Sequence, residues 1–334
     1  MGLPLLAFLV VLLGPAAAVG AAPLDLQGLG LPLDCLLGET CWLVNYVDTD
    51  PSTQARDFRC GPRTYNGHDG TDFAIRDLGV MAKGVSVVAS APGLVMSVRD
   101  GVADAALTGA ASRARVKGKA CGNGVVLDHG EGGETQYCHL RRGSITVKVG
   151  ERVEAGARLG LVGLSGQTEF PHVHLAVRRD GRAVDPFTGR GAASGCGQEG
   201  QALWGAGLFL PYEEVVLYHA GFAADRPDPA AIRKGEGLDG LLSASAPALV
   251  FWVDIFGVEA GDRLRFQITG PDGKPVLEEE QPIEKTQARR FAYVGKRLKA
   301  ETWPSGSYTG RVTLTRSAEG GELSREVVRT VTVR

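Results

Sequence analysis

The sequence predicts a mainly β protein in which a glycine-rich antiparallel β-sheet domain precedes a β-sandwich. The 334 residues include 47 glycines, and many of these separate short apolar segments. Residues 123–140 show apolar alternation on both sides of a glycine turn, which is typical of an antiparallel hairpin. After residue 241, short apolar segments and turns recur regularly, as in β-sandwiches. At 44% hydrophobic residues, a chain of this length can bury a core in each of two domains.

The amino-terminal residues 1–22 are expected to be a secretory signal peptide. Leu3–Leu13 is an uninterrupted apolar run, and small residues follow it up to Ala22, with cleavage plausible after Ala18 or Ala22. The run is shorter than the roughly 20 residues of a membrane-spanning helix. We therefore expect an exported protein of the periplasm or cell envelope. A formal net charge of -2, without a run of Lys or Arg, argues against a nucleic-acid partner.

The six cysteines are expected to form disulfides. Their even number fits an exported chain, and no CxxC pair is present that would favour a metal site. Proximity in the sequence favours Cys35–Cys41 and Cys121–Cys138, which leaves Cys60–Cys196 by elimination. Other connectivities remain compatible with the spacing.

Residues 23–65 are expected to be a mostly irregular lead-in, and a β-rich domain is expected over residues 66–195. The inserted segment Asp100–Ala120, rich in small residues, is expected to be a surface loop beside a groove. Strands are predicted at Cys41–Val47, Asp72–Ile75, on both sides of the turn Ala91-Pro92-Gly93, at Asn123–His129, at Thr135–Leu140 and in short pieces within 146–162.

Two segments of this domain carry candidate metal ligands. His172 and His174 project from the same side of a predicted strand, because side chains alternate along a strand. His68 and Asp72 lie in a glycine-rich turn, where they form either an arm for a divalent metal or a hydrogen bond that stiffens a loop. An isolated HxH is more typical of a surface strand, so the metal interpretation requires both segments to meet.

The remaining histidines differ in their sequence context. His139 lies between Cys138 and Leu140 on a predicted strand, where a merely solvated histidine would be unusual. His129 borders a turn and is expected to have a structural or surface role, and His219 is expected at the surface.

In this order, the segments HDGTDF, CGNGVVLDHG, TQYCHL and SGQTEFPHVHL resemble the lysostaphin-type (LytM-like) zinc metallopeptidases that cut peptidoglycan cross-links. The resemblance covers about residues 67–186 and implies a LytM-like peptidase domain. It implies that His68, Asp72 and His174 hold one zinc ion and that His139 and His172 are catalytic. Three protein ligands leave an open position for water, as a catalytic zinc site requires. The two further histidines could then deprotonate that water, stabilise the oxyanion and protonate the leaving amine.

The resemblance also implies a lesser role for Asn123, in substrate binding or in shaping the groove. The sequence departs from the family pattern at Glu169-Phe170-Pro171, where a small Ser/Thr-Gly-Pro run is common, and this departure bears on substrate preference. Cys121 stands where an aromatic residue is usual and Cys138 falls in the YxHL motif, which further favours a bond between these two cysteines.

The C-terminal part is expected to be a linker over 196–240, with a short strand at Glu214–Tyr218, and an immunoglobulin-like β-sandwich over 241–334. The sandwich contains no histidine or cysteine, so we expect it to contact an envelope partner protein, bind cell wall or act as a spacer. Its predicted strands are Ala248–Phe256, Arg263–Thr269, Ala288–Val294, Tyr308–Thr315 and Val327–Val333.

Two functions from different classes fit the resemblance. The first is an exported zinc metalloendopeptidase that hydrolyses peptide cross-links between peptidoglycan stem peptides, with a D-Ala to diaminopimelate bond favoured over a pentaglycine bridge. The alternative is a non-catalytic LytM-like regulator that activates a cell-wall amidase. Such regulators typically lose zinc ligands or catalytic histidines, whereas all five positions are intact here. A structural envelope protein with unrelated histidines would not account for the order of the motifs.

Overall fold

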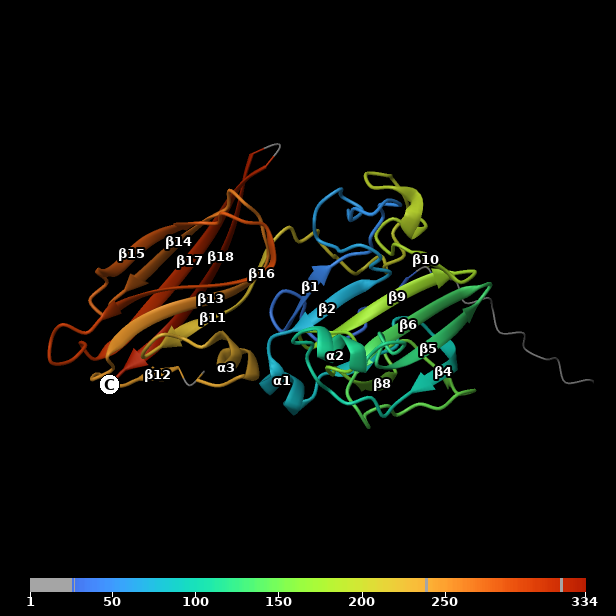
Figure 1. Cartoon of the computed structure of the whole chain (residues 1–334), viewed down its shortest axis with the longest axis horizontal. Helices are drawn as coiled ribbons and strands as arrows, with labels where there is room; N and C mark the ends of the chain where they lie inside the picture. Colours follow the sequence, from blue (N-terminus) through green and yellow to red (C-terminus); the bar gives the residue numbers. More distant parts are fainter. Residues whose placement is uncertain (1–25, 27, 238–239, 319–320) are drawn as a thin grey trace, which may run out of the picture.

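The structure is a computed structural model, and it describes residues 26, 28–237, 240–318 and 321–334. The predicted signal peptide lies outside the described residues. The described chain is mainly β, as predicted, and forms two β-rich units that lie side by side (Figure 1). No helix in the described part is long and apolar enough to cross a membrane.

The first unit is built on an eight-stranded antiparallel sheet with the order β1-β2-β9-β6-β5-β4-β7, to which β10 adds by pairing with β9. The hairpin predicted over 123–140 is confirmed as β5 and β6. The strands of this sheet are β1 (Cys41–Asn45), β2 (Thr71–Ile75), β4 (Gly93–Arg99), β5 (Asn123–Gly130), β6 (Gly133–Leu140), β7 (Arg152–Val153), β9 (His172–Arg179) and β10 (Arg182–Val184).

The two strands predicted around Ala91-Pro92-Gly93 exist, but they do not pair with each other. β3 (Ser86–Val88) pairs with β8 (Arg158–Leu161) in a separate two-stranded sheet, whereas β4 pairs with β5 and β7. The turn therefore passes the chain from one sheet to the other. The helices of this unit are short: α1 (Leu78–Lys83), α2 (Ala110–Arg115) within the predicted surface loop, and the 3-10 turn η1 (Ala192–Ser194).

The central strands β2 and β9 divide their side chains between a core face and a site face. Phe73, Val173 and Leu175 are fully buried in the hydrophobic core of the first unit. Alternation sends Asp72, His172 and His174 to the opposite face. The antiparallel register pairs Asp72 directly with His174, so the two candidate ligand segments meet across neighbouring strands.

The second unit consists of two sheets that share one hydrophobic core. One sheet has the order β11-β13-β16 and the other β12-β18-β17-β14-β15. The immunoglobulin-like strand arrangement stays a prediction. The strands are β11 (Val216–Ala223), β12 (Leu241–Leu242), β13 (Ala248–Val258), β14 (Arg263–Thr269), β15 (Pro275–Pro282), β16 (Gln287–Arg297), β17 (Gly306–Ala318) and β18 (Gly321–Val333).

The segment expected as a linker contributes structure to this second unit. β11 is longer than the predicted strand and pairs with β13, and the short helix α3 (Pro229–Lys234) follows it. The expectation that His219 lies at the surface is wrong: only 3% of it is exposed. Pairing of β11 with β13 buries the ring, whose centroid lies 4.8 Å from that of Trp252.

A small apolar cluster joins the two units. Trp42, Val44 and Ala74 of the first unit pack against Val216, Tyr218 and Phe256 of the second, and Phe170 packs on the edge of this cluster. Phe170 lies two residues before His172, so the contact between the units borders the candidate site.

The cysteines form the three disulfides that the sequence favours. Cys35–Cys41 closes a turn before β1, and Cys121–Cys138 joins the end of the inserted loop to β6. Cys60–Cys196 ties the lead-in to the segment that follows β10.

Candidate active site

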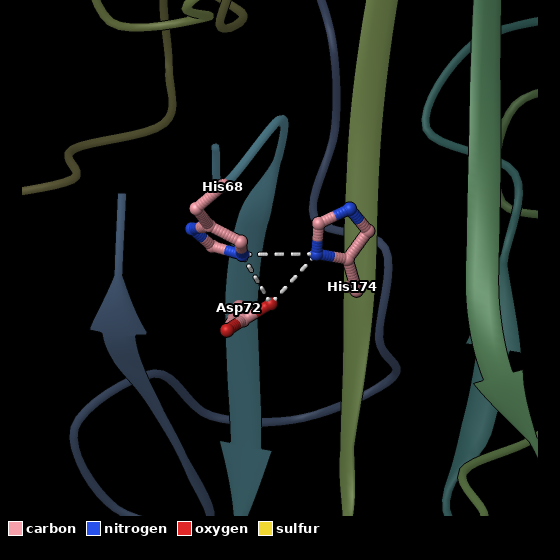
Figure 2. A group of neighbouring side chains, drawn as sticks. All are labelled: His68, Asp72 and His174. Carbon is pink, nitrogen blue, oxygen red and sulfur yellow. Dashed lines mark hydrogen bonds and ion pairs between the residues drawn. The ribbon is translucent and has the colours of Figure 1, made fainter. Parts of the chain in front are cut away.

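Three candidate ligand atoms of the first unit converge on one point (Figure 2). Oδ1 of Asp72 lies 3.1 Å from Nε2 of His68 and 2.9 Å from Nδ1 of His174, and these two nitrogens are 3.0 Å apart. Asp72 comes from β2, His174 from β9, and His68 from the glycine turn that leads into β2. Gly70 in that turn has no room for a side chain, because a Cβ would lie 2.5 Å from Nε2 of His174.

The outer atoms of the three side chains have their own partners, which fix the direction of each inner atom. Nδ1 of His68 donates to the carbonyl of Tyr46 at 2.6 Å, so Nε2 keeps its lone pair in the neutral ring. Nε2 of His174 donates to Oδ1 of Asp69 at 3.2 Å, which leaves the lone pair on Nδ1. Asn45 donates to Oδ2 of Asp72 at 2.9 Å. Partners of this kind orient metal ligands in known metal sites.

The three inner atoms fit a zinc ion. Zinc binds nitrogen and carboxylate oxygen at about 2.0–2.1 Å in tetrahedral geometry, which places its ligand atoms roughly 3.3 Å apart. The observed separations of 2.9–3.1 Å are close to this value. Without a cation or a proton between them, three lone pairs at this distance repel one another. Two histidines and one carboxylate also form a ligand set that leaves the fourth position open.

The charges around these atoms favour a cation. Burial raises the pKa of Asp72, but the neighbouring His68 and His172 outweigh it and hold that pKa well below its usual value. Burial lowers the pKa of His174, whereas its hydrogen bonds to Asp69 and Asp72 raise it, with a net rise to about 9. Both shifts reflect the attraction between the Asp72 carboxylate and the imidazoles packed against it.

The two candidate catalytic histidines flank the three ligand atoms. The ring centroids of His139 and His172 are 4.6 Å apart, and Nε2 of His172 lies 3.5 Å from Oδ1 of Asp72. Nδ1 of His139 donates to the carbonyl of Ser165 at 2.8 Å, and Nδ1 of His172 donates to the carbonyl of Phe170 at 2.9 Å. Each ring therefore keeps a lone pair on Nε2. His139 has a φ of 65°, a strained conformation for a non-glycine residue of the kind found at functional sites.

The ligand atoms and the flanking histidines open into two adjoining clefts. The first is lined by His68, Asp69, His139, His174 and Arg178 and continues along the Cys121–Cys138 disulfide. The second is lined by Asp72, Phe170 and His172 on one side and by residues of β13 and β16 on the other. Tyr65 and Gln167 lie on the boundary and line both clefts.

Two further residues from the sequence analysis, Asn123 and His129, lie away from these clefts. Asn123 is fully buried, and its side chain bonds to the backbone of Val102 and Leu140, so any effect on substrate passes through the loop that it holds. His129 is buried and structural: it bonds to the carbonyl of Pro92 and to Thr135.

Sequence reasoning missed three residues that surround the site: Asn45, Asp69 and Tyr65. Asp69 had a signal, because it stands inside the HDGTD segment beside two predicted ligands. Tyr65, 52% exposed with its ring centroid 4.3 Å from that of His68, had none beyond its place before the glycine turn. The contact of Asn45 with Asp72 depends on the pairing of β1 with β2, which the sequence did not specify.

Most of the antiparallel sheet and the whole His–Asp–His group lie within the part of the chain that matches a known family model. Residues 66–186 match Peptidase family M23, which confirms the LytM-like resemblance over this part of the chain.

Relatives with curated names match parts of this chain. A peptidoglycan DD-endopeptidase, ShyA of Vibrio cholerae, is 34% identical over 118 residues, which are 35% of this chain and 22% of that protein. A murein hydrolase activator, EnvC of Escherichia coli, is 40% identical over 62 residues, which are 19% of this chain and 14% of that protein. The chain thus spans a minor part of either relative. A solved zinc-containing peptidase of Vibrio cholerae aligns with 49% of this chain and 39% of its own at 21% identity, with a TM-score of 0.31.

Proposed function

We propose that the protein is an exported zinc metalloendopeptidase of the periplasm or cell envelope that hydrolyses peptide cross-links of peptidoglycan. The observation that carries this proposal is the convergence of His68, Asp72 and His174 with two further histidines, His139 and His172, at the meeting point of two clefts. The named relatives support peptidoglycan stem peptides as the substrate class.

His68, Asp72 and His174 would hold the zinc ion. When bound there, zinc supplies a water whose pKa is lowered to about 7 and polarises the peptide carbonyl. The outer hydrogen bonds to Tyr46 and Asp69 keep both ligand histidines in the tautomer that presents a lone pair inward.

His139 and His172 would move the protons of the reaction. Each donates Nδ1–H to a backbone carbonyl and keeps a lone pair on Nε2, so each can accept a proton from an attacking water. The protonated ring can then stabilise the oxyanion or donate to the leaving amine. The peptide would lie along the clefts, where Tyr65 and Gln167 line both sides of the reacting position.

The direct test is mass spectrometry of purified sacculi after digestion with the mature protein. We expect new amine and carboxyl ends within the stem peptides, because an endopeptidase cuts one peptide bond of the cross-link. The new ends should disappear with His174→Ala and after chelation, whereas Glu154→Gln, an exposed residue of the same domain, should digest like the wild type.

The alternative is a non-catalytic regulator that activates a separate amidase. The observation that favours this alternative is the match to a murein hydrolase activator. All five histidine and aspartate positions are present here, which supports the enzyme. Unchanged muropeptides from a protein with bound zinc, together with stimulation of an added amidase, would replace the enzyme by this regulator.

A further inference from the structure

Phe170 occupies the point at which the second unit touches the candidate catalytic apparatus. Its ring centroid lies 4.7 Å from that of His172 and 5.0 Å from that of Phe256 on β13. Its carbonyl accepts the hydrogen bond from Nδ1 of His172 at 2.9 Å. One residue thus contacts His172 through both its ring and its backbone, and it stands where the family pattern commonly has a small residue.

The second unit fixes the ring of Phe170 through Phe256 and Arg289. The guanidinium carbon of Arg289, on β16, lies 5.9 Å from the ring centroid of Phe170, 5.2 Å from that of Phe256 and 5.3 Å from that of Tyr218. Cation–π contacts of this kind are stabilising within about 6 Å. The three aromatic rings and the guanidinium therefore form one packed group that spans both units.

Arg289 is itself held by a buried carboxylate. Asp254 is fully buried and accepts from Nη2 of Arg289 at 2.9 Å. The same carboxylate accepts from Arg233 at 2.8 Å and 3.1 Å and from the hydroxyl of Tyr218 at 2.6 Å. With so many partners on one buried group, the position of the guanidinium over the rings is strongly constrained.

The same contact builds a wall of the active-site cleft. Phe170, His172 and Asp72 face Val258 at the end of β13 and Gln287 at the start of β16 across the second cleft. The C-terminal unit thus lies next to His172 and Asp72. A domain that served only as a spacer would not need this position.

We propose that the second unit, which is the C-terminal unit, is part of the catalytic apparatus of the enzyme. Through Phe170, which acts as a positioning residue, it holds His172 in its productive orientation. This inference rests on the proposed peptidase function. Phe170 contacts His172 and is not one of the three candidate metal ligands, so its loss should lower kcat rather than metal binding. Small displacements of a catalytic group can cost up to about 100-fold in rate, and we expect a decrease of about 10-fold.

The experiment uses the full chain with zinc and a purified dimeric muropeptide as substrate. Phe170→Ala should lower kcat about 10-fold and change KM less than it changes kcat, because the orientation of His172 acts on the transition state whereas loss of one cleft-lining ring only weakens substrate binding. Phe170→Tyr, which keeps the ring, should retain most of the activity. Arg289→Met should lower kcat in the wild-type background but not further in the Phe170→Ala background. Arg297→Met, an exposed arginine at the other end of β16, is the matched control.

Two measurements independent of turnover accompany the kinetics. Zinc content should equal that of the wild type in every variant. The imidazole NMR signal of His172, assigned by its loss in His172→Gln, should move in Phe170→Ala and Arg289→Met and stay in place in Arg297→Met. Circular dichroism checks that each variant is folded.

The proposal is overturned if folded Phe170→Ala keeps the wild-type kcat, if Arg289→Met acts equally in both backgrounds, or if the His172 signal does not move. Absence of cleavage by the wild type would instead count against the proposed function. The NMR arm then still decides whether the C-terminal unit and His172 are linked.

Discussion

Asp69 lies beside the candidate metal ligands, where it accepts from His174 through one oxygen and from Arg178 through the other at 3.0 Å. We expect Asp69→Asn to weaken zinc affinity about 10- to 100-fold, because loss of the carboxylate removes the partner that orients the His174 ring. Competition with a chromogenic chelator measures the affinity. Glu154→Gln is the control, and an unchanged affinity in Asp69→Asn would show that His174 is oriented without Asp69.

The residues that meet at the candidate site were predictable, and those that orient them were less so. His68, Asp72, His139, His172 and His174 stand in short motifs whose order along the chain carries the information. Their partners include backbone carbonyls of Tyr46, Ser165 and Phe170, which any residue type supplies. Sequence reasoning from residue type cannot find such partners.

At the level of elements, β11, β13 and β16 meet around Asp254. The two arginines Arg233 and Arg289 depend on this one carboxylate for charge compensation. Asp254→Asn should lower the free energy of unfolding of the C-terminal unit by about 3 kcal/mol, because removing one partner leaves partly buried charges unpaired. Denaturant unfolding measures the loss. Asp272→Asn, in an exposed turn, should change it little, and an equal effect of both variants would contradict the assigned role.

The same carboxylate predicts a pH dependence. Burial alone would raise the pKa of Asp254. The hydrogen bonds and charges of Arg233 and Arg289 lower it by more than burial raises it, so the net pKa lies below the usual value. A depressed pKa in the folded state contributes stability above the unfolded pKa of about 4, and this contribution is lost as the pH falls toward the folded value. The stability difference between the wild type and Asp254→Asn should therefore shrink below about pH 4. A difference that stays constant from pH 7 to pH 3 would rule this out.

Most strands were predictable because they alternate or are continuously apolar, and the exceptions have identifiable causes. β15 has the sequence PVLEEEQP, and its exposed edge position leaves it without an apolar pattern. The partners of β3 and β4 could not be inferred, since a turn residue shows where the chain bends and not which strand follows in the sheet. β11 was assigned to a linker because its pairing with β13 is a tertiary contact.

Across the whole molecule, the disulfides differ widely in the length of chain that they close. Cys60–Cys196 spans a separation of 136 residues and Cys35–Cys41 one of 6. A disulfide stabilises the folded state because it reduces the entropy of the unfolded chain, and the effect grows with the length of the closed loop. Replacing both cysteines of the longer loop with Ala should therefore lower the free energy of unfolding by about 4–5 kcal/mol, and the same change in the shorter loop by about 2 kcal/mol. Unfolding of the two double variants measures the difference. Equal losses would show that strain or residual structure outweighs chain entropy.

The positions of the cysteines along the chain also affect the order in which the disulfides can form during synthesis. A chain made from its amino end presents Cys35 and Cys41 first, then Cys60, then Cys121 and Cys138, and Cys196 last. Cys60 therefore remains an unpaired thiol while two wrong partners emerge. Cys121 and Cys138 are only 17 residues apart, so they find each other at lower entropic cost than either finds Cys60. The positions of the cysteines along the chain thus favour the sequence of oxidation events that ends in the native pairing.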